Sequence, residues 1–87
     1  MRIDRFLKET QVIKRRALAH EACEKGAIRI NGRPAKPSGE VKSGDVVTIS
    51  MRDGERVVTV RILEVPENGR AGSANVEVSV VDTFGGK

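Results

Sequence analysis

The stretch KRRALAHEACEKGAIRING spans residues 14–32 and reads, in order, as a helix, a helix stop, a short strand and a turn. Its three leading cations, Lys14, Arg15 and Arg16, stand at the expected helix start, where unpaired backbone N–H groups already carry partial positive charge. That placement costs a few tenths to about one kcal/mol per cation. Because local rules are often broken for function, the three cations are candidate binding residues. The alternative is a solvated helix end whose charge is incidental.

Helical spacing of apolar residues predicts that residues 14–25 form a helix with one buried face. The expected buried positions are Leu18, Ala19, Ala22 and Cys23. Gly26 follows at the position where a left-handed residue commonly ends a helix. Most of the stripe is small, so this helix can approach its neighbours closely.

A β-hairpin is predicted next. Ile28 and Ile30 alternate with Arg29, which indicates a short strand with the arginine pointing outward. Asn31-Gly32 is a strong hairpin-turn signal, because both residues tolerate positive φ. The returning segment contains Pro34, which is typical of an edge or irregular strand.

The flanking sequence completes the fold prediction. Before the central stretch, Met1 to Glu9 reads as an amphipathic helix whose apolar stripe is Ile3, Phe6 and Leu7. After it, alternating patterns predict strands at residues 46–51, 56–65 and 76–81, with a hairpin turn at Asp53-Gly54 and a polar loop at residues 66–74. We therefore expect one α+β domain over residues 1–81, with two N-terminal helices packed on a small antiparallel sheet of four to five strands. Residues 82–87 are expected to form a flexible tail.

Charge is distributed unevenly along the 87 residues, whose net charge is +4. Residues 1–36 hold ten Lys or Arg and four Asp or Glu, a net +6, whereas residues 37–87 hold six and eight, a net −2. A one-sided basic region points to a polyanionic partner. There are no Trp or Tyr residues and only two Phe, so the chain has few aromatic platforms for stacking single-stranded bases.

Other classes of protein are disfavoured. The N-terminus does not read as a signal peptide, and no window is apolar enough to cross a membrane. The single cysteine fits a reducing compartment. We therefore expect a cytoplasmic protein without a membrane partner. We also expect a monomer that does not bind DNA.

Catalytic and metal chemistry is also unpromising in this sequence. His20 and Cys23 could face one ion from a helix, but zinc prefers four ligands and the chain has no other Cys or His. Asp4 and Glu9 lie five residues apart, so they do not share a helix face well. We expect no cofactor, no metal and no enzymatic activity. His20 should be half exposed and Cys23 should lie in the core.

The remaining candidate site is a group of basic side chains. If both helices pack on the sheet, their outward cations form one surface made of Arg2, Arg5, Lys8, Lys14, Arg15 and Arg16. Arg29, Arg33 and Lys36 would extend this surface near the hairpin. Arginine can bind phosphate oxygens with two parallel hydrogen bonds, so arginines are the stronger candidates for fixed contacts.

Several short motifs, in order, resemble the S-four RNA-binding domain, named for a small-subunit ribosomal protein. They are RIDRFL at 2–7, Arg16 with Ala19, GAI at 26–28, NG at 31–32, KPS at 36–38 and VKSGD at 41–45. The resemblance runs from Arg2 to about Ile49 and implies that the helices and hairpin bind structured RNA. Such domains usually have Ser-Arg where this chain has Arg15-Arg16, which puts the usual helix cap in doubt.

Within that class the chain is similar to the small bacterial RqcP (YabO) family, which is related to the fifteen-kilodalton ribosome-binding heat-shock protein. This similarity implies binding to rRNA and peptidyl-site tRNA on obstructed large ribosomal subunits, in support of alanine tailing of stalled chains by RqcH. By position, Arg2 and Arg16 would be the main RNA contacts, followed by Lys14 and Arg15, while Asp4 would orient a neighbouring arginine. Two alternatives stay open: a general ribosome-associated heat-shock-type factor that recycles large subunits, and a protein adaptor that uses the acidic second half.

Overall fold

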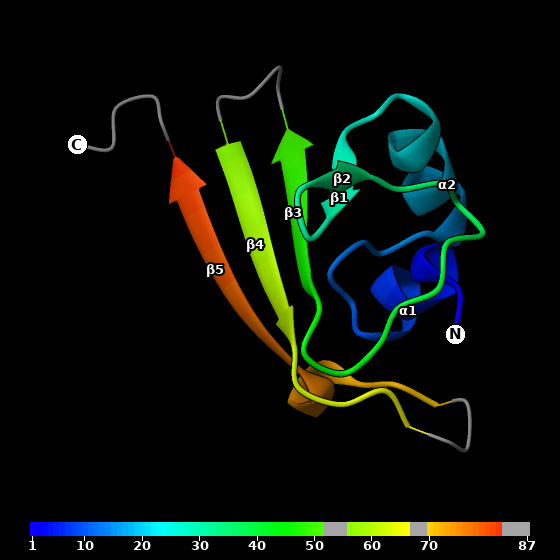
Figure 1. Ribbon diagram of the computed structural model, residues 1–87, viewed down its shortest axis with the longest axis vertical. Helices are drawn as coiled ribbons and strands as arrows, with labels where there is room; N and C mark the ends of the chain where they lie inside the picture. Colours follow the sequence, from blue (N-terminus) through cyan, green and yellow to red (C-terminus); the bar gives the residue numbers. More distant parts are fainter. Residues whose placement is uncertain (52–55, 67–69, 83–87) are drawn as a thin grey trace.

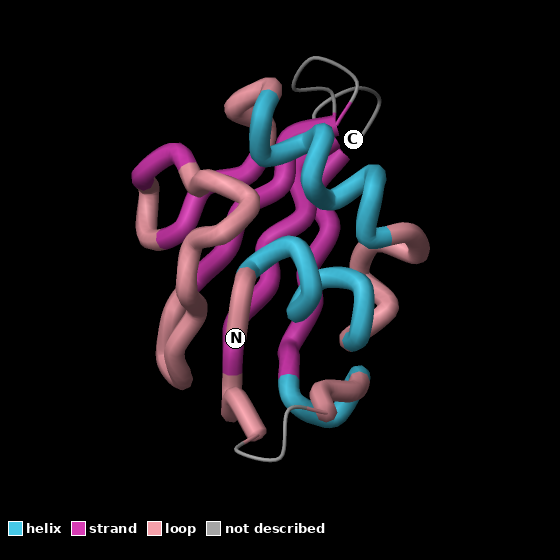
Figure 2. Tube along the Cα trace, turned by 90° about the vertical axis from the view of Figure 1, so that its right-hand side faces the viewer, coloured by secondary structure: helices cyan, strands magenta, loops and turns pink. Residues whose placement is uncertain are grey.

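The computed structural model describes residues 1–51, 56–66 and 70–82, which form two helices on one side of a five-stranded antiparallel sheet (Figure 1, Figure 2). The predicted α+β class is confirmed. In chain order the elements are α1 (Ile3–Glu9), α2 (Arg16–Glu24), β1 (Ile28–Ile30), β2 (Arg33–Pro34), β3 (Val46–Met51), β4 (Arg56–Ile62), the 3-10 helix η1 (Ser73–Asn75) and β5 (Val76–Asp82).

Helix α1 begins after Arg2, slightly later than predicted, and buries its apolar stripe of Ile3, Phe6 and Leu7 completely. It ends where Thr10 and Gln11 leave the helical pattern. The Thr10 hydroxyl donates to the Phe6 carbonyl oxygen at 2.9 Å, and Gln11 adopts a left-handed φ of 66°. The chain then turns back toward α2.

Helix α2 begins at Arg16, with Arg15 as an extended N-cap residue that makes no side-chain capping bond. The doubt raised by the missing serine cap is therefore confirmed. Gly26 ends this helix at a φ of 77°, and the N–H groups of Gly26 and Ala27 donate to the last turn, as expected for a glycine stop.

The predicted buried face of α2 is only partly correct. Ala19 and Cys23 are buried and Ala22 is half-buried, but Leu18 is 51% exposed. Helix α2 packs on α1 and β1 through the side that holds Ala19 and Cys23. Leu18 lies about 100° around the helix from Ala19 and so points away from both neighbours. Its assignment to the core was wrong.

The hairpin between β1 and β2 has the predicted turn, since Asn31 and Gly32 both adopt left-handed φ angles of 53° and 84°. Asn31 also anchors the hairpin to the start of β3. Its side-chain oxygen accepts from the Val46 N–H at 2.9 Å, and its side-chain nitrogen donates to Asp45 at 3.1 Å.

The sheet has the strand order β2-β1-β3-β4-β5. Strand β3 has the predicted bounds, β4 ends at Ile62 instead of Val65, and η1 lies at the end of the region predicted as a polar loop. Strand β5 extends through Asp82. The predicted Asp53-Gly54 turn and residues 83–87 of the expected tail lie outside the described residues.

The core lies between the helices and the inner face of β1, β3 and β4. Residues Val58, Val60 and Ile62 of β4 are on this face, as predicted, and each is at most 6% exposed. In register with them, Val80, Val78 and Val76 of β5 occupy the same face. Figure 1 shows β5 at the sheet edge far from the helices, and Val78 and Val80 are correspondingly half exposed. The helices therefore cover only part of the sheet.

Candidate nucleic-acid interface

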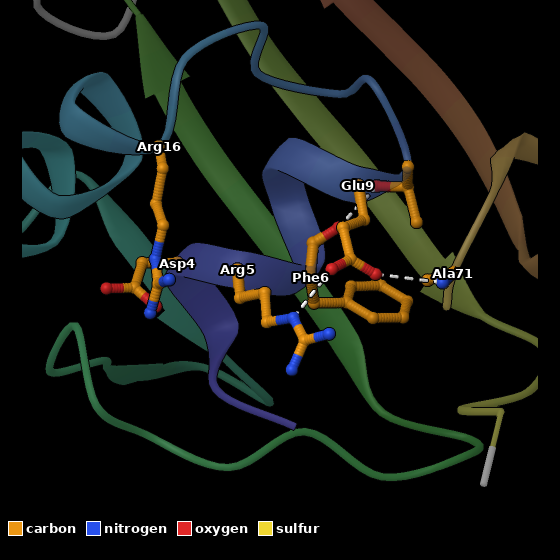
Figure 3. A network of polar contacts seen from close by, with 7 residues as sticks. Asp4, Arg5, Phe6, Glu9, Arg16 and Ala71 are labelled. Atoms are coloured by element: carbon orange, nitrogen blue, oxygen red, sulfur yellow. Dashed lines mark hydrogen bonds and ion pairs between the residues drawn. The ribbon is translucent and has the colours of Figure 1, made fainter. Parts of the chain in front are cut away.

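Two arginines converge on one buried carboxylate at the surface where α1 meets α2. A terminal guanidinium nitrogen of Arg2 lies 3.0 Å from Oδ2 of Asp4, and one of Arg16 lies 3.3 Å from Oδ1. Asp4 is 1% exposed, whereas both arginine side chains are about half exposed. Figure 3 shows the Arg16 side chain extending from the start of α2 to Asp4. The expectation that Arg2 and Arg16 share one exterior surface is confirmed.

The backbone around each arginine is held by a different part of the chain. Arg2 is extended and forms an isolated antiparallel bridge with Glu40, while the N–H of Ile3 donates to the Gly39 carbonyl oxygen at 2.7 Å. Arg16 is the first residue of α2. The site therefore joins the N-terminal segment, the loop after β2 and the start of α2.

Arg5 directly follows Asp4 in α1, and its side chain is held by a second carboxylate, that of Glu9. Its Nε donates to Glu9 Oε2 at 2.6 Å, and Glu9 Oε1 accepts from the backbone N–H of Ala71 at 2.9 Å (Figure 3). The hydrogen bond from Ala71 and then that from Arg5 lower the pKa of Glu9 from its usual 4.5. Arg5 is consequently engaged within the protein, although its side chain is half exposed.

The other predicted site residues are all exposed but do not all share this surface. Lys8 lies in the last turn of α1, and Lys14 and Arg15 directly precede α2. Lys36 lies in the loop that follows β2.

Arg33 and Arg29 lie on opposite faces of the sheet. Arg33 pairs with Ile30, which packs against the core, so Arg33 is on the helix side of the sheet edge. Arg29 pairs with Thr48, and neighbouring residues of a strand point to opposite faces, so Arg29 is on the face away from the helices. The expected extension of the helical surface to Arg29 is therefore wrong.

A model of the S4 domain matches residues 1–47, which is more than half of the chain. The chain belongs to the S4 domain family. The matched segment holds both helices and the β1–β2 hairpin, and with them Arg2, Asp4 and Arg16.

Similar proteins narrow the comparison. The RQC P-site tRNA stabilizing factor of Halalkalibacterium halodurans is 48% identical over 75 residues, which are 86% of this chain and 83% of the relative. The factor of the same name from Bacillus subtilis is 45% identical over 74 residues, covering 85% of this chain and 84% of the relative. Among solved structures, trimeric heat shock protein 15 of Vibrio cholerae superposes with a TM-score of 0.73 at 29% identity, covering 91% of this chain and 81% of that one. The predicted family resemblance is confirmed.

The role of Asp4 in this S4 domain was predicted only in part from the sequence. Asp4 was expected to orient one arginine, yet it binds two. Asp4 lies next to Leu7 at the margin of the apolar stripe of α1, so its helical position alone did not decide between a buried and an exposed carboxylate. Buried charges are usually paired, and a cation run was the available partner. By contrast, no local pattern indicated that Glu9 would accept a hydrogen bond from Ala71.

The groups considered for metal or thiol chemistry lie as expected. Cys23 is buried in the core, where burial and then the negative charge of Asp4 raise its pKa to about 11. His20 is half exposed and lies 3.5 Å from Glu24. Within the described residues, no group of three or more His, Cys, Asp or Glu could hold a metal ion. In the same part of the chain, no helix is long and apolar enough to cross a membrane.

Proposed function

We propose that this protein binds structured RNA on the large ribosomal subunit, without catalysing a reaction, as part of bacterial ribosome-associated quality control. The observation that carries the proposal is the convergence of Arg2 and Arg16 on buried Asp4, within the segment that matches the S4 domain. The names of the similar factors support the same class of role. We propose that this role is performed in the cytoplasm.

The finer part of the proposal concerns the partners. We expect the protein to contact rRNA and peptidyl-site tRNA on obstructed subunits and to support alanine tailing by RqcH. Resemblance to the RqcP family and the tRNA in the names of the similar factors support this assignment. The expected monomeric state stays a prediction.

The chemistry of the site suits a folded RNA backbone. Each guanidinium has five N–H donors, and each arginine lends one terminal nitrogen to Asp4. The remaining donors of the half-exposed side chains can bind phosphate oxygens, and their fixed spacing favours an RNA of matching shape. Lys14 and Arg15 add charge next to the start of α2, which strengthens attraction over a longer range.

Binding of purified large ribosomal subunits tests the proposal. Arg2→Ala and Arg16→Ala should each weaken co-sedimentation. Each leaves one arginine on the buried Asp4 carboxylate, so the protein should stay folded but with a lower melting temperature. Arg61→Ala is the matched control, since Arg61 is exposed on the outer sheet face, where it pairs with Glu77. If about five phosphates are neutralised, log affinity should fall with log salt at a slope of about −4. A slope near zero, or equal loss in all three variants, would contradict the proposal.

The heat-shock-type alternative predicts a different set of co-purifying molecules. If the protein acts in tailing, large subunits isolated with it should be enriched in peptidyl-tRNA and RqcH. Large subunits without either component would favour a general recycling factor.

A protein adaptor is the second candidate, favoured by the uncovered part of the sheet. Val78 and Val80 are half exposed on β5, which is the last strand in the sheet order. Binding through this apolar strand would survive high salt and nuclease treatment, because neither affects apolar contacts. Loss of ribosome association under either treatment would instead favour the RNA-binding proposal.

A further inference from the structure

An acidic side chain at the centre of a cationic surface opposes phosphate binding if charge alone is considered. Asp4 removes one positive charge from the neighbourhood of Arg2 and Arg16, and burial of a carboxylate is itself unfavourable unless it is paired. Asp4 is nevertheless 1% exposed and sits beside fully buried Ile3 and Leu7. If Asp4 does not weaken RNA binding overall, it must also contribute something favourable to that binding.

The contacts of Asp4 indicate what that contribution is. Each carboxylate oxygen binds a different arginine, and the two arginines come from positions that are 14 residues apart in the sequence. Asp4 is inaccessible, so a bound RNA would contact the guanidinium groups and not the carboxylate. The carboxylate thus sets the spacing and direction of two phosphate-binding groups from beneath.

We propose that Asp4 is a positioning residue that orders Arg2 and Arg16 before RNA arrives. This inference rests on the proposed function and assigns a role within the same site. Ordering a long side chain on binding opposes association, so a side chain that is already ordered binds more tightly. The positioning effect and the charge effect of Asp4 have opposite signs, which makes them separable.

The decisive variant is Asp4→Asn, tested for binding to purified large ribosomal subunits. Asparagine keeps the size of the side chain but has one acceptor oxygen in place of two, so it can hold only one arginine and without charge assistance. If Asp4 positions the arginines, affinity should fall about tenfold, the order expected when two long side chains must be ordered during binding. If Asp4 acts through charge alone, affinity should rise, because the variant is more positive by one charge.

Glu21→Gln is the matched control. It makes the same change of charge on α2, where exposed Glu21 lies 3.7 Å from Lys25 and contacts neither arginine of the site. Its affinity should be equal to or tighter than that of the wild-type protein. Weaker binding of Asp4→Asn together with unchanged or tighter binding of Glu21→Gln would support the inference; unchanged or tighter binding of Asp4→Asn would overturn it.

A double-mutant cycle separates the inference from the proposed function. If Asp4 acts through the arginines, Asp4→Asn should have a smaller effect in the Arg2→Ala/Arg16→Ala background than in the wild-type protein. Equal effects in both backgrounds would overturn positioning while leaving RNA binding intact. If the two arginine substitutions leave affinity unchanged, the proposed function itself fails.

A measurement on the wild-type protein keeps the inference testable even if Asp4→Asn does not fold. Nitrogen NMR of the RNA-free protein should show slower guanidinium rotation in Arg2 and Arg16 than in exposed Arg15. Rotation in Arg2 and Arg16 as fast as that in Arg15 would mean that Asp4 does not order them and would overturn the inference.

Discussion

At the scale of single residues, Asp4 of α1 and Cys23 of α2 are both buried, but Asp4 is paired with cations and Cys23 is held as a neutral thiol. Asp4 stays paired with arginines at the edge of the core, whereas Cys23 is 5% exposed and surrounded by apolar side chains. Burial and the nearby Asp4 carboxylate both disfavour a thiolate, which raises the Cys23 pKa to about 11. The single cysteine therefore behaves as a core side chain.

Cys23 should react slowly with iodoacetamide in the native protein. Raising the pKa from 9.0 to about 11 lowers the thiolate fraction at pH 8 by about a hundredfold, and burial restricts access further. Mass spectrometry of timed samples at pH 8 measures the rate, with the same protein in denaturant as the control. Equal rates in the two conditions would contradict the burial of Cys23.

At the scale of elements, Glu9 joins α1 to the segment between β4 and β5. Its carboxylate accepts from Arg5 on its own helix and from the N–H of Ala71, which is 62 residues away in the sequence. Ala71 is half-buried and packs against the core. This link fixes a segment with little regular structure of its own onto the first helix.

The Glu9 link should make stability depend on pH in the acid range. The folded protein holds the Glu9 pKa below 4.5, so the folded state binds fewer protons than the unfolded state near that pH. Its stabilising contribution is therefore complete above about pH 4.5 and is lost as pH falls through the lower, folded-state pKa. Denaturant unfolding of wild type and Glu9→Gln measures the difference, which should be present at pH 7 and disappear in acid.

Glu24→Gln serves as the comparison for that experiment. The Glu24 side chain is exposed at the end of α2, where it neighbours His20, and exposed pairs of this kind contribute little to stability. A difference between wild type and Glu9→Gln that persists unchanged to low pH would mean that the Glu9 charge is not what secures the link.

At the scale of the whole molecule, two short helices cover a sheet that is wider than they are. The helices bury the inner face of β1, β3 and β4, while β5 continues the sheet beyond them (Figure 1). Directly paired valines therefore differ in environment although they occupy the same face. Val58 is 6% exposed, whereas its partner Val80 is 57% exposed.

Valine truncations on this one face should separate into two groups. Val60→Ala should lower the free energy of unfolding by about 2 kcal/mol, because it removes fully buried methyl groups and leaves a cavity. Val80→Ala should change it by no more than about 0.5 kcal/mol, because its side chain is already half in water. Urea unfolding of both variants tests this. Similar losses would mean that another surface covers β5.

Local sequence was sufficient for most of the fold. The apolar stripe of α1, the glycine stop of α2, the Asn31-Gly32 turn and the alternation of β3 and β4 each depend on neighbours within a few residues. Such patterns reflect backbone geometry, which a short segment carries with it. The basic character of the first helices also follows directly from composition.

The remaining features of the fold and of the site were decided by how the helices, strands and loops pack together. The exposure of Leu18, the attachment of Ala71 to Glu9 and the gathering of Arg2 and Arg16 around one carboxylate all depend on how distant segments are oriented against each other. A helical pattern fixes which residues share a stripe, but not which part of the stripe meets a neighbour. The contacts that hold this site therefore exist only once α1, α2 and the later loops have packed together.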